Sequence, residues 1–376
     1  MAKNLVIVLF SIIVFIGLSA SVVDALYGGG EPFPDRSGEA VYSADKLETV
    51  ADLPFPPGNI AVTPSGKIFF TFHPEARPDY NLAELVDGEA QPLRIESNTP
   101  LNIETVLSLR VDQQNRLWLL DNADHGQGTP KLLAIDIDTR EVVHYHEFSS
   151  AIAGFGSHLN DFQVDAKGET IYIADASILG LDPAIIVYDI ASQQARRVLD
   201  DHASVEPDKY LPYVEGEKML IFGVFAIRPG VDSIALDRRG EWLYFAPVTD
   251  EHMHRVRVSD LKNPQLTADQ LEQKVERFAE KTMSDGITMD DQGRIYISDL
   301  EHSAIVEMNG QGEMRTLIKD KKLRWPDGFS FGPNGDLYVT ASGLQYVLGK
   351  PDSYIAQHAP YQIFKLSTDA TAIPGH

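Results

Sequence analysis

One pattern of apolar and polar residues recurs six times along the chain. Each copy begins with a polar pair, continues as an alternating apolar strand, turns at a Gly or Asn residue, and returns as a second strand rich in Tyr, Trp and Phe. Such a unit predicts a β-hairpin, because Gly and Asn accept the positive φ angles of tight turns. All-strand units at a spacing of roughly 40–70 residues are typical of propeller blades and not of stacked solenoid turns. The first strands of the copies begin near Gly58, Leu109, Asn160, Asp232, Asp285 and Asp327.

The pattern therefore predicts an all-β fold, a six-bladed β-propeller in a single closed ring. After the sixth hairpin only residues 361–366 can supply a third strand, so a four-stranded last blade needs a strand from elsewhere. Residues 46–51 precede the first hairpin and have strand composition. We expect them to form the outer strand of the last blade and to join the two ends of the domain. The predicted propeller covers residues 46–370, and residues 26–45 form a leader.

Two insertions interrupt the regular spacing of the predicted hairpins. Residues 200–223, in the longest interval between hairpins, contain an acidic loop and an apolar run, which predicts extra strands or a lid over one face. Thr267 and Gln270 have the spacing of a capping box, and Leu271, Val275 and Phe278 share one helical stripe. This spacing predicts a short surface helix near residues 268–280.

Charge and composition limit the partners of the protein. The net charge of −23 repels phosphate backbones, so we expect no nucleic acid among its partners. The absence of cysteine excludes disulfides, thiol catalysis and Cys-ligated metals. Lys3 precedes an apolar stretch at residues 5–18, and small residues follow it up to Ala25. This predicts a signal peptide at residues 1–25, cleaved after Ala20 or Ala25, and a secreted or periplasmic protein with no membrane contact after cleavage; an uncleaved anchor is the alternative.

The candidate chemistry lies where the first strands begin, because the first strand of each blade lines the central channel. The position two residues before the first apolar residue of each strand is occupied by Gly58, Leu107, Asn160, Asp232, Asp285 and Asp327. Converging carboxylates need a cation, a proton or water to relieve their repulsion, and hard oxygen ligands suit Ca²⁺ or another divalent cation. We therefore predict a metal site made by Asn160, Asp232, Asp285 and Asp327. The alternative is that each Asp caps the turn into its strand.

A second set of polar residues ends the aromatic strands. It comprises Asp121, Asp175 and Asp299, followed by polar loops that include His125 and His302. Because a hairpin returns to the face on which it started, these loops are expected around the same mouth, and we predict that Asp121, Asp299 and His302 bind a ligand. His158 and Asn160 are the predicted catalytic residues, with His158 moving a proton. The alternative for all of these residues is ordinary hydrogen bonding within loops.

Several motifs give the chain a family resemblance. It resembles the major royal jelly/Yellow protein family, in its bacterial branch, from about Leu47 to Leu366. The motifs that carry the resemblance lie at residues 107–112, 116–121, 159–165, 186–189, 242–247, 283–286, 296–302 and 323–327. The resemblance implies a secreted six-bladed propeller. It fixes no reaction, since members include binders of small amines or sterols and pigment-pathway proteins linked to dopachrome conversion.

The chain has a more distant likeness to the calcium-dependent gluconolactonase/regucalcin propellers. Asn160-Asp161 resembles their substrate-side Asn-Asp, Asp285-Gly286 resembles their metal-binding Asp-Gly, and Asp232 falls where they have a metal-binding Asn. Gly58 stands in place of their Glu ligand, and Asp327 would supply the missing charge. Two functions follow. The first is a Yellow-like propeller that binds or isomerises a small organic molecule, related to dopachrome tautomerases, at the channel mouth. The alternative is a divalent-metal-dependent lactonase or hydrolase.

Overall fold

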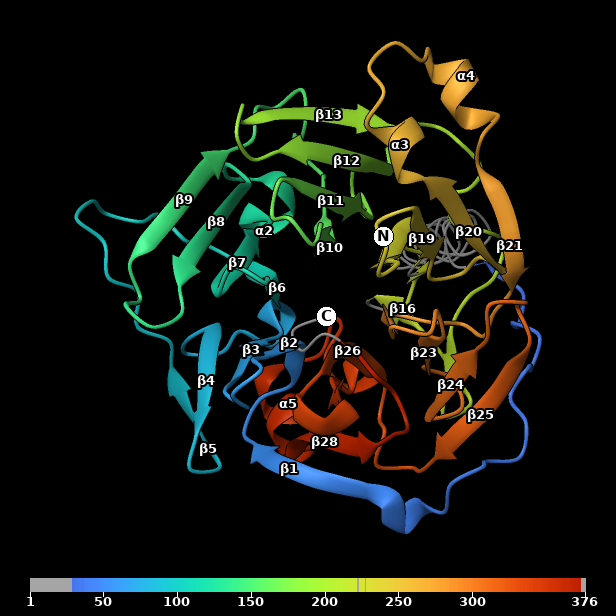
Figure 1. Ribbon diagram of the computed structural model, residues 1–376. Helices are drawn as coiled ribbons and strands as arrows, with labels where there is room; N and C mark the ends of the chain where they lie inside the picture. Colours follow the sequence, from blue (N-terminus) through green and yellow to red (C-terminus); the bar gives the residue numbers. More distant parts are fainter. Residues whose placement is uncertain (1–28, 222, 227, 373–376) are drawn as a thin grey trace, which may run out of the picture.

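The computed structural model describes residues 29–221, 223–226 and 228–372. In this part of the chain, six four-stranded antiparallel sheets surround a common centre (Figure 1). The prediction of an all-β six-bladed propeller is confirmed. The predicted signal peptide lies outside the described residues. Within the described ranges, no helix has both the length and the apolar character to cross a membrane.

The first three blades follow one another along the chain, each from its innermost to its outermost strand. Blade 1 consists of β2 (Pro57–Val62), β3 (Ile68–Phe72), β4 (Leu82–Val86) and β5 (Glu89–Pro92). Blade 2 consists of β6 (Val106–Val111), β7 (Arg116–Asp121), β8 (Lys131–Asp136) and β9 (Val142–Glu147). Blade 3 consists of β10 (Leu159–Val164), β11 (Thr170–Asp175), β12 (Ala184–Asp189) and β13 (Gln194–Val198).

The remaining blades complete the ring. Blade 4 consists of β18 (Val231–Leu236), β19 (Trp242–Pro247), β20 (His252–Arg257) and β21 (Glu276–Glu280). Blade 5 consists of β22 (Ile287–Met289), β23 (Ile295–Asp299), β24 (Ala304–Met308) and β25 (Met314–Lys319). Blade 6 consists of β26 (Pro326–Phe331), β27 (Asp336–Ala341), β28 (Tyr361–Ser367) and β1 (Leu47–Leu53). The innermost strands β2, β6, β10, β18, β22 and β26 contact one another in a closed circle.

The ring closes through a strand from the beginning of the domain. β1 pairs antiparallel with β28, from Leu47 opposite Leu366 to Leu53 opposite Tyr361. The predicted pairing of residues near 46–51 with residues near 362–366 is confirmed. Without β1, the edge of β28 would expose unpaired N–H and C=O groups, which is an aggregation hazard for a sheet.

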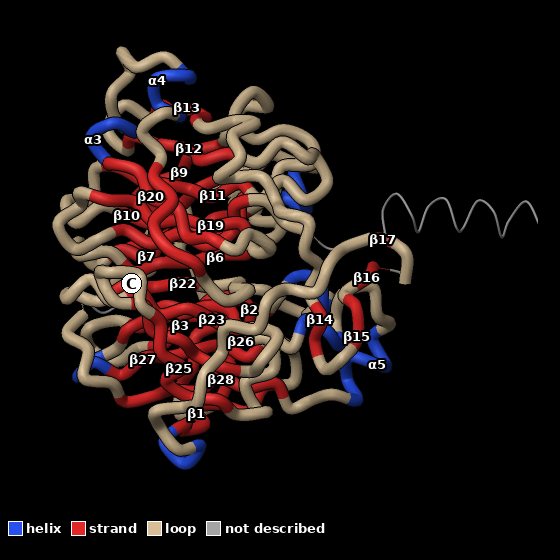
Figure 2. Tube along the Cα trace, turned by 90° about the vertical axis from the view of Figure 1, so that its right-hand side faces the viewer, coloured by secondary structure: helices blue, strands red, loops and turns tan. Residues whose placement is uncertain are grey.

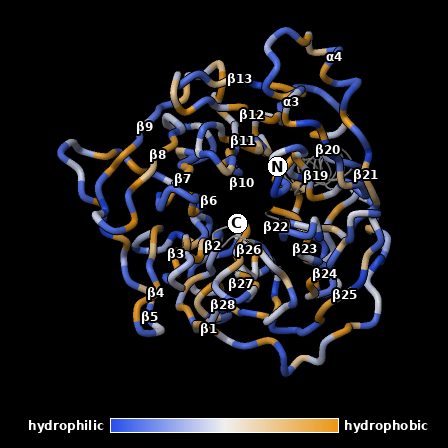
Figure 3. Tube along the Cα trace, in the orientation of Figure 1, coloured by the Kyte–Doolittle hydropathy of each residue, from blue (hydrophilic) through white to orange (hydrophobic). Residues whose placement is uncertain are grey.

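The aromatic second strands form the core between the blades. Trp118 of β7, Tyr172 of β11 and Tyr296 of β23 have no solvent-exposed area. Each such ring packs against the next blade, as Tyr296 does with Phe331 of blade 6 at 5.3 Å between ring centroids. The middle strands are apolar at consecutive positions, as in β12, because both faces of a blade pack against neighbouring blades, and Figure 3 shows hydrophobic stretches among hydrophilic ones along the chain.

Two short helices lie on blade 4, α3 (Val258–Leu261) and α4 (Ala268–Glu272). The predicted capping box of Thr267 and Gln270 is present, and Leu271 is buried. The predicted helix up to residue 280 is wrong, because the segment that contains Phe278 forms β21. The helical spacing of Val275 and Phe278 is overridden by the outer strand that β20 needs as a partner.

The insertion between blades 3 and 4 forms two small hairpins. They are β14 (Tyr213–Val214) with β15 (Glu217–Lys218), and β16 (Leu220–Ile221) with β17 (Phe225–Ala226). Figure 2 shows these hairpins and α5 (Asp352–Gln357) on the same side of the ring. The interval that was expected to hold extra strands or a lid therefore forms strands that stand over one face.

The described part of the leader lies along the outside of the ring. Glu31 bridges to Tyr210 near the hairpin insertion, and Arg36 forms ion pairs with Glu251 and Glu280 of blade 4. The chain then continues past blade 5, where Tyr42 N–H donates to the Leu317 carbonyl oxygen at 2.8 Å, and through the turn η1 (Ala44–Lys46) into β1. These contacts tie blades 4, 5 and 6 together from outside.

Candidate functional site at the channel mouth

A cavity of about 780 Å³ opens at one mouth of the channel. The structure brings together there all six residues predicted at the starts of the inner strands, namely Gly58, Leu107, Asn160, Asp232, Asp285 and Asp327. They converge because every blade places the start of its first strand on the same face. The volume lies within the range of roughly 300–1,000 Å³ that is usual for small-molecule sites.

Three carboxylates line the inner part of the cavity, and we call Asp232, Asp285 and Asp327 the acidic ring. Burial raises the pKa of Asp232 and of Asp327 well above the ordinary value, and the neighbouring Asp285 carboxylate raises both further. Burial also raises the pKa of Asp285, to about 6. None of the three forms an ion pair with a side chain in the described part of the protein. The ring therefore holds protons more tightly than ordinary carboxylates do.

Two uncharged donors orient the acidic ring. The amide nitrogen of Asn160 donates to Asp232, and the indole N–H of Trp325 donates to Asp285 Oδ2. These hydrogen bonds satisfy individual carboxylate oxygens without cancelling the charge. Asn160 is thus held beside Asp232 by its own side chain, and both face the cavity.

A fully paired carboxylate lies next to the acidic ring. Arg110 Nη2 lies 2.8 Å from both carboxylate oxygens of Asp161, and the two side chains are only 3% and 9% exposed. Arg110 Nη1 also donates to Asn59 Oδ1 at 2.7 Å, and Ser108 Oγ donates to Asp161 Oδ1 at 2.8 Å. This ion pair ties β2, β6 and β10 together at the channel and compensates the charge of Asp161.

A second polar part of the cavity wall consists of three histidines and a glutamate, and we call His73, Glu75, His125 and His158 the histidine wall. His158 Nδ1 lies 2.9 Å from His125 Nδ1, and His125 Nε2 lies 3.1 Å from Glu75 Oε1. Burial lowers the pKa of His158 well below its usual value and that of His73 to about 4. The hydrogen bond from His125 lowers the pKa of Glu75 to about 2. His73 and His158 are therefore neutral at pH 7, and Glu75 is ionised.

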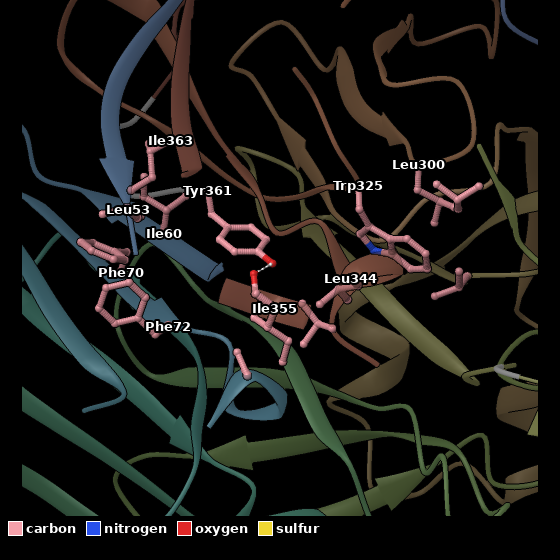
Figure 4. Close-up of a cluster of buried hydrophobic side chains, with 14 of the residues drawn as sticks. Leu53, Ile60, Phe70, Phe72, Leu300, Trp325, Leu344, Ile355, Tyr361 and Ile363 are labelled. Carbon is pink, nitrogen blue, oxygen red and sulfur yellow. Dashed lines mark hydrogen bonds between the residues drawn. The ribbon is translucent and has the colours of Figure 1, made fainter. Parts of the chain in front are cut away.

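Apolar side chains form another part of the cavity wall. They are Leu179, Ile221, Val248, Leu344 and Leu348, together with Trp325, and the charged residues Arg77, Lys350 and Asp352 line the same cavity. Figure 4 shows Trp325 and Leu344 beside the buried cluster under α5, where the Tyr361 hydroxyl donates to the Ile355 carbonyl oxygen at 2.9 Å. The hairpin insertion contributes Ile221, so the cavity combines the acidic ring with an apolar wall.

The second-strand carboxylates lie outside the residues that line this cavity. Asp121 accepts hydrogen bonds from the backbone N–H groups of Glu104, Thr105 and Ala123 at 2.7–2.9 Å. Asp299 accepts from His302 Nδ1 at 2.9 Å, and this bond raises the pKa of His302. These contacts match the loop-bonding alternative, and ligand binding by Asp121, Asp299 and His302 stays a prediction.

Carboxylates that accept backbone N–H groups also position the histidine wall. Asp175 Oδ1 accepts the backbone N–H of His158 at 2.8 Å, as Asp121 accepts that of Ala123 at the start of α2 (Ala123–Gly126). Ala123, Asp124 and His125 have φ angles of 52°, 52° and 57°, so His125 stands on a left-handed turn of L-residues. Such a turn costs roughly 1–2 kcal/mol per residue and persists where its surroundings impose it.

Sequence reasoning did not assign roles to His73 and Glu75. Both follow β3, in the turn η2 (Pro74–Ala76), at the place where the His125 loop follows β7. The loop after each aromatic strand returns to the mouth, so their position follows from the same rule, but their loop lacks the Asp that marks the loops after β7, β11 and β23. No pattern in the sequence indicates the contact of His125 with His158, because it depends on the left-handed turn.

The chemistry of the acidic ring suits a hard divalent cation, since its oxygens are buried and their charges are not compensated. The donor set is incomplete, however. In the described residues, no three His, Cys, Asp or Glu side chains have the geometry to hold a metal ion. The equivalent position of blade 1 is Gly58, which has no side chain. A Cβ atom there would lie 2.9 Å from Thr71 Oγ1. The residues fit such a cation in their chemistry, and their present arrangement does not enclose one.

The fold and the site define the class of protein to which the chain belongs, a closed six-bladed propeller with a ligand-sized cavity at one channel mouth. Residues 104–370 match the family model described as major royal jelly protein. The chain belongs to the major royal jelly protein family.

A curated relative and several solved structures are also similar. Major royal jelly protein 6 of Apis mellifera is 25% identical over 215 residues, which cover 54% of this chain and 47% of the relative, so the match spans about half of that protein. A luciferin-regenerating enzyme has a TM-score of 0.57 at 12% identity, over 88% of this chain and 97% of that one. Regucalcin of Agrobacterium tumefaciens, a calcium-binding protein, has a TM-score of 0.55 at 16% identity, over 86% and 94%. A gluconolactonase of Xanthomonas campestris has a TM-score of 0.55 at 13% identity, over 91% and 98%. At these identities the structures share the fold with this chain.

Proposed function

We propose that this protein binds or isomerises a small organic molecule at the channel mouth. The observation that carries the proposal is the cavity of about 780 Å³ that is lined by both an uncompensated acidic ring and an apolar wall. Buried carboxylates that no side-chain cation pairs favour a ligand that brings its own positive charge or strong hydrogen-bond donors. The apolar wall favours a hydrocarbon or aromatic body in the rest of the ligand.

The isomerising form of the proposal uses the histidine wall. A tautomerisation needs a base that takes a proton from one atom of the ligand and an acid that returns a proton to another. His158, neutral because of its burial, is suited to accept the first proton. The acidic ring keeps protonated carboxyl groups near neutral pH, and these are suited to donate to a carbonyl oxygen.

A pair of probes with the same apolar body tests the binding part of the proposal. 2-Phenylethylammonium and 2-phenylethanol differ in the charged group and share the phenethyl part. We expect calorimetry to detect the ammonium with a clear preference over the alcohol, and Asp232→Asn to weaken ammonium binding about tenfold, or 1.4 kcal/mol. Asp87→Asn, an exchange of the same type at an exposed turn, is the control. Equal affinity for both probes, or an Asp232→Asn variant that binds like the parent, would contradict the proposal.

The second candidate function is a divalent-metal-dependent lactonase or hydrolase, and the acidic ring is the observation that favours it. Asp232, Asp285 and Asp327 would hold the cation, with Asn160 beside them, and a bound cation would supply polarisation of a carbonyl group. Elemental analysis of protein purified without chelator should then find a stoichiometric divalent metal, and hydrolysis of an aldonolactone should depend on it. Metal-free protein that hydrolyses no lactone after addition of Ca²⁺, Mg²⁺ or Mn²⁺ would rule this function out.

We further propose that the protein is secreted or periplasmic and works without nucleic acid or membrane partners. The proposal is supported by the signal-like residues 1–25 and by the net charge of −23. Intact-mass measurement of protein from its native host should show a chain that starts after Ala20 or Ala25. A full-length chain recovered in the membrane fraction would favour an uncleaved anchor.

A further inference from the structure

The histidine wall contains a continuous chain of hydrogen-bonding atoms. It runs from Glu75 Oε1 to His125 Nε2 over 3.1 Å, and from His125 Nδ1 to His158 Nδ1 over 2.9 Å. The two imidazole rings are nearly parallel, with 19° between their planes and 4.5 Å between their centroids. The groups belong to three different blades, since Glu75 follows β3, His125 follows β7 and His158 precedes β10.

The order of donors along this chain is fixed by chemistry. An ionised carboxylate only accepts hydrogen bonds, so Glu75 requires a proton on His125 Nε2. In a neutral imidazole the other nitrogen is then an acceptor, so His125 Nδ1 can only receive a hydrogen from His158 Nδ1. A neutral His158 that donates from Nδ1 has a free lone pair on Nε2. No described residue is within hydrogen-bond contact of that Nε2 atom, and His158 lines the cavity.

We propose that Glu75, acting through His125, fixes the tautomer of His158 so that His158 Nε2 presents a hydrogen-bond acceptor to the ligand. Glu75 and His125 are positioning residues in this arrangement, and His158 is the group that contacts the ligand. The inference rests on the proposed function, because it assumes that the cavity is the ligand site.

The neighbouring His73 adds a second, opposite preference. Its Nδ1 accepts the backbone N–H of Glu75 at 3.3 Å, and burial holds its pKa at about 4, so its single proton lies on Nε2. His73 lines the same cavity. The wall therefore offers an acceptor at His158 and a donor at His73, which together suit a ligand group that both donates and accepts. A hydroxyl, an enol or a carboxamide has this property, and an ether or a simple ketone has not.

The charged and titratable groups around the chain of hydrogen bonds are few, and two of them, His73 and His158, are neutral at pH 7. Glu75, His73 and His158 face His125, while Arg77 and Asp124 line the small adjoining cavity of about 200 Å³. The guanidinium of Arg77 forms an ion pair with Asp352 at 2.6 Å and donates to the Lys350 carbonyl oxygen at 2.9 Å. Asp124 accepts from the Gln127 side chain. Glu75 is thus the carboxylate that sets the direction of the chain.

Histidine-selective ¹⁵N NMR of the full-length protein without ligand tests the inference. At pH 8, imidazoles of ordinary basicity are neutral, and protonated and unprotonated ring nitrogens resonate far apart. His158→Gln identifies the signals of His158 by their loss. We expect an unprotonated Nε2 and a protonated Nδ1 for His158 in the parent, and the reverse pattern in the parent would overturn the inference.

Two substitutions of Glu75 test its control over the tautomer. Glu75→Gln can donate or accept, so the His158 Nε2 signal should shift toward an average of the two tautomers. Glu75→Lys can only donate to His125, so His158 should carry its proton on Nε2. Glu89→Gln, at an exposed site of the same blade, should leave the parent pattern unchanged. If His158 kept its parent tautomer in both Glu75 variants, Glu75 would have only a structural role. Because no ligand is present, failure here is separate from failure of the binding proposal.

Discussion

Replacing Asp285 by Asn should stabilise the metal-free protein above pH 6. The carboxylate of Asp285 is buried beside Asp232 and Asp327, and burial raises its pKa from 3.8 to about 6. At 1.36 kcal/mol for each pKa unit, ionisation of this group lowers the free energy of unfolding by about 3 kcal/mol. Asn has nearly the same shape, its carbonyl oxygen can still accept from Trp325 Nε1, and its amide can donate to Asp232.

The pH dependence has a definite sign. A carboxylate with a raised pKa binds protons more tightly in the folded state, so its contribution to stability is lost as the pH rises from the unfolded value through the folded value. Buried histidines such as His73, whose pKa is lowered to about 4, gain stability over the same pH range, so the effect of Asp285 is read from the difference between Asp285→Asn and the parent in chelator, which should grow between pH 4 and pH 6. The gain of Asp285→Asn should be small at pH 4 and approach several degrees at pH 8.

Scanning calorimetry with and without divalent cations is the assay. A cation that binds the acidic ring would stabilise the parent by mass action, by about 2.7 kcal/mol at a hundredfold excess over Kd, and stabilise Asp285→Asn less. Asp87→Asn should behave like the parent in every condition. An Asp285→Asn variant that is no more stable than the parent at pH 8 in chelator, or a stability difference that does not grow between pH 4 and pH 8, would refute the electrostatic reasoning.

Three further outcomes follow from the packing of the ring. Deletion of residues 26–52 removes most of β1 and leaves the outer edge of β28 unpaired, so urea unfolding should show a large loss of stability. A deletion variant as stable as the parent would disprove the closing role. Arg110→Met leaves the Asp161 charge uncompensated and should cost roughly 3–5 kcal/mol. Combining it with Asp161→Asn should recover much of that loss in the same assay, whereas additive losses would contradict the pairing. Arg77→Ala breaks an ion pair with Asp352 that is at least half exposed, so its cost should stay within about 1 kcal/mol.

Much of the architecture follows from the sequence, because it depends on local patterns. Alternation with period two and turn residues such as Asn115 and Gly240, which adopt positive φ angles here, predict the hairpins. The closing strand follows from counting strands. The outer strand β21 did not follow, since Val275 and Phe278 also fit a helical stripe and only the pairing with β20 selects a strand. Periodicity alone cannot distinguish the two when a neighbouring strand supplies the missing hydrogen bonds.

The site could be predicted in part for the same reason. Asp232 and Asp285 occupy equivalent places in their blades, so the symmetry of the ring brings them to one mouth. The contact of His125 with His158 breaks that symmetry, because it needs three successive residues of positive φ before Gly126. A Cβ at Gly126 would lie 2.0 Å from the Gly154 carbonyl oxygen, so this turn is also held by close packing against the loop before β10. Such a fit between two loops has no signature in either segment alone.

The channel contains both a carboxylate with an ion-pair partner and the three carboxylates of the acidic ring. In the same channel, Asp161 is compensated by an ion pair with Arg110, with both side chains more than nine-tenths buried. Asp232, Asp285 and Asp327 lie beside it with raised pKa values and without any such partner in the described residues. An arginine contributed by one neighbouring strand is enough to neutralise a carboxylate here, as Arg110 of β6 shows. Because uncompensated buried charge lowers stability, its concentration at the cavity supports the proposed binding of a group that restores the balance.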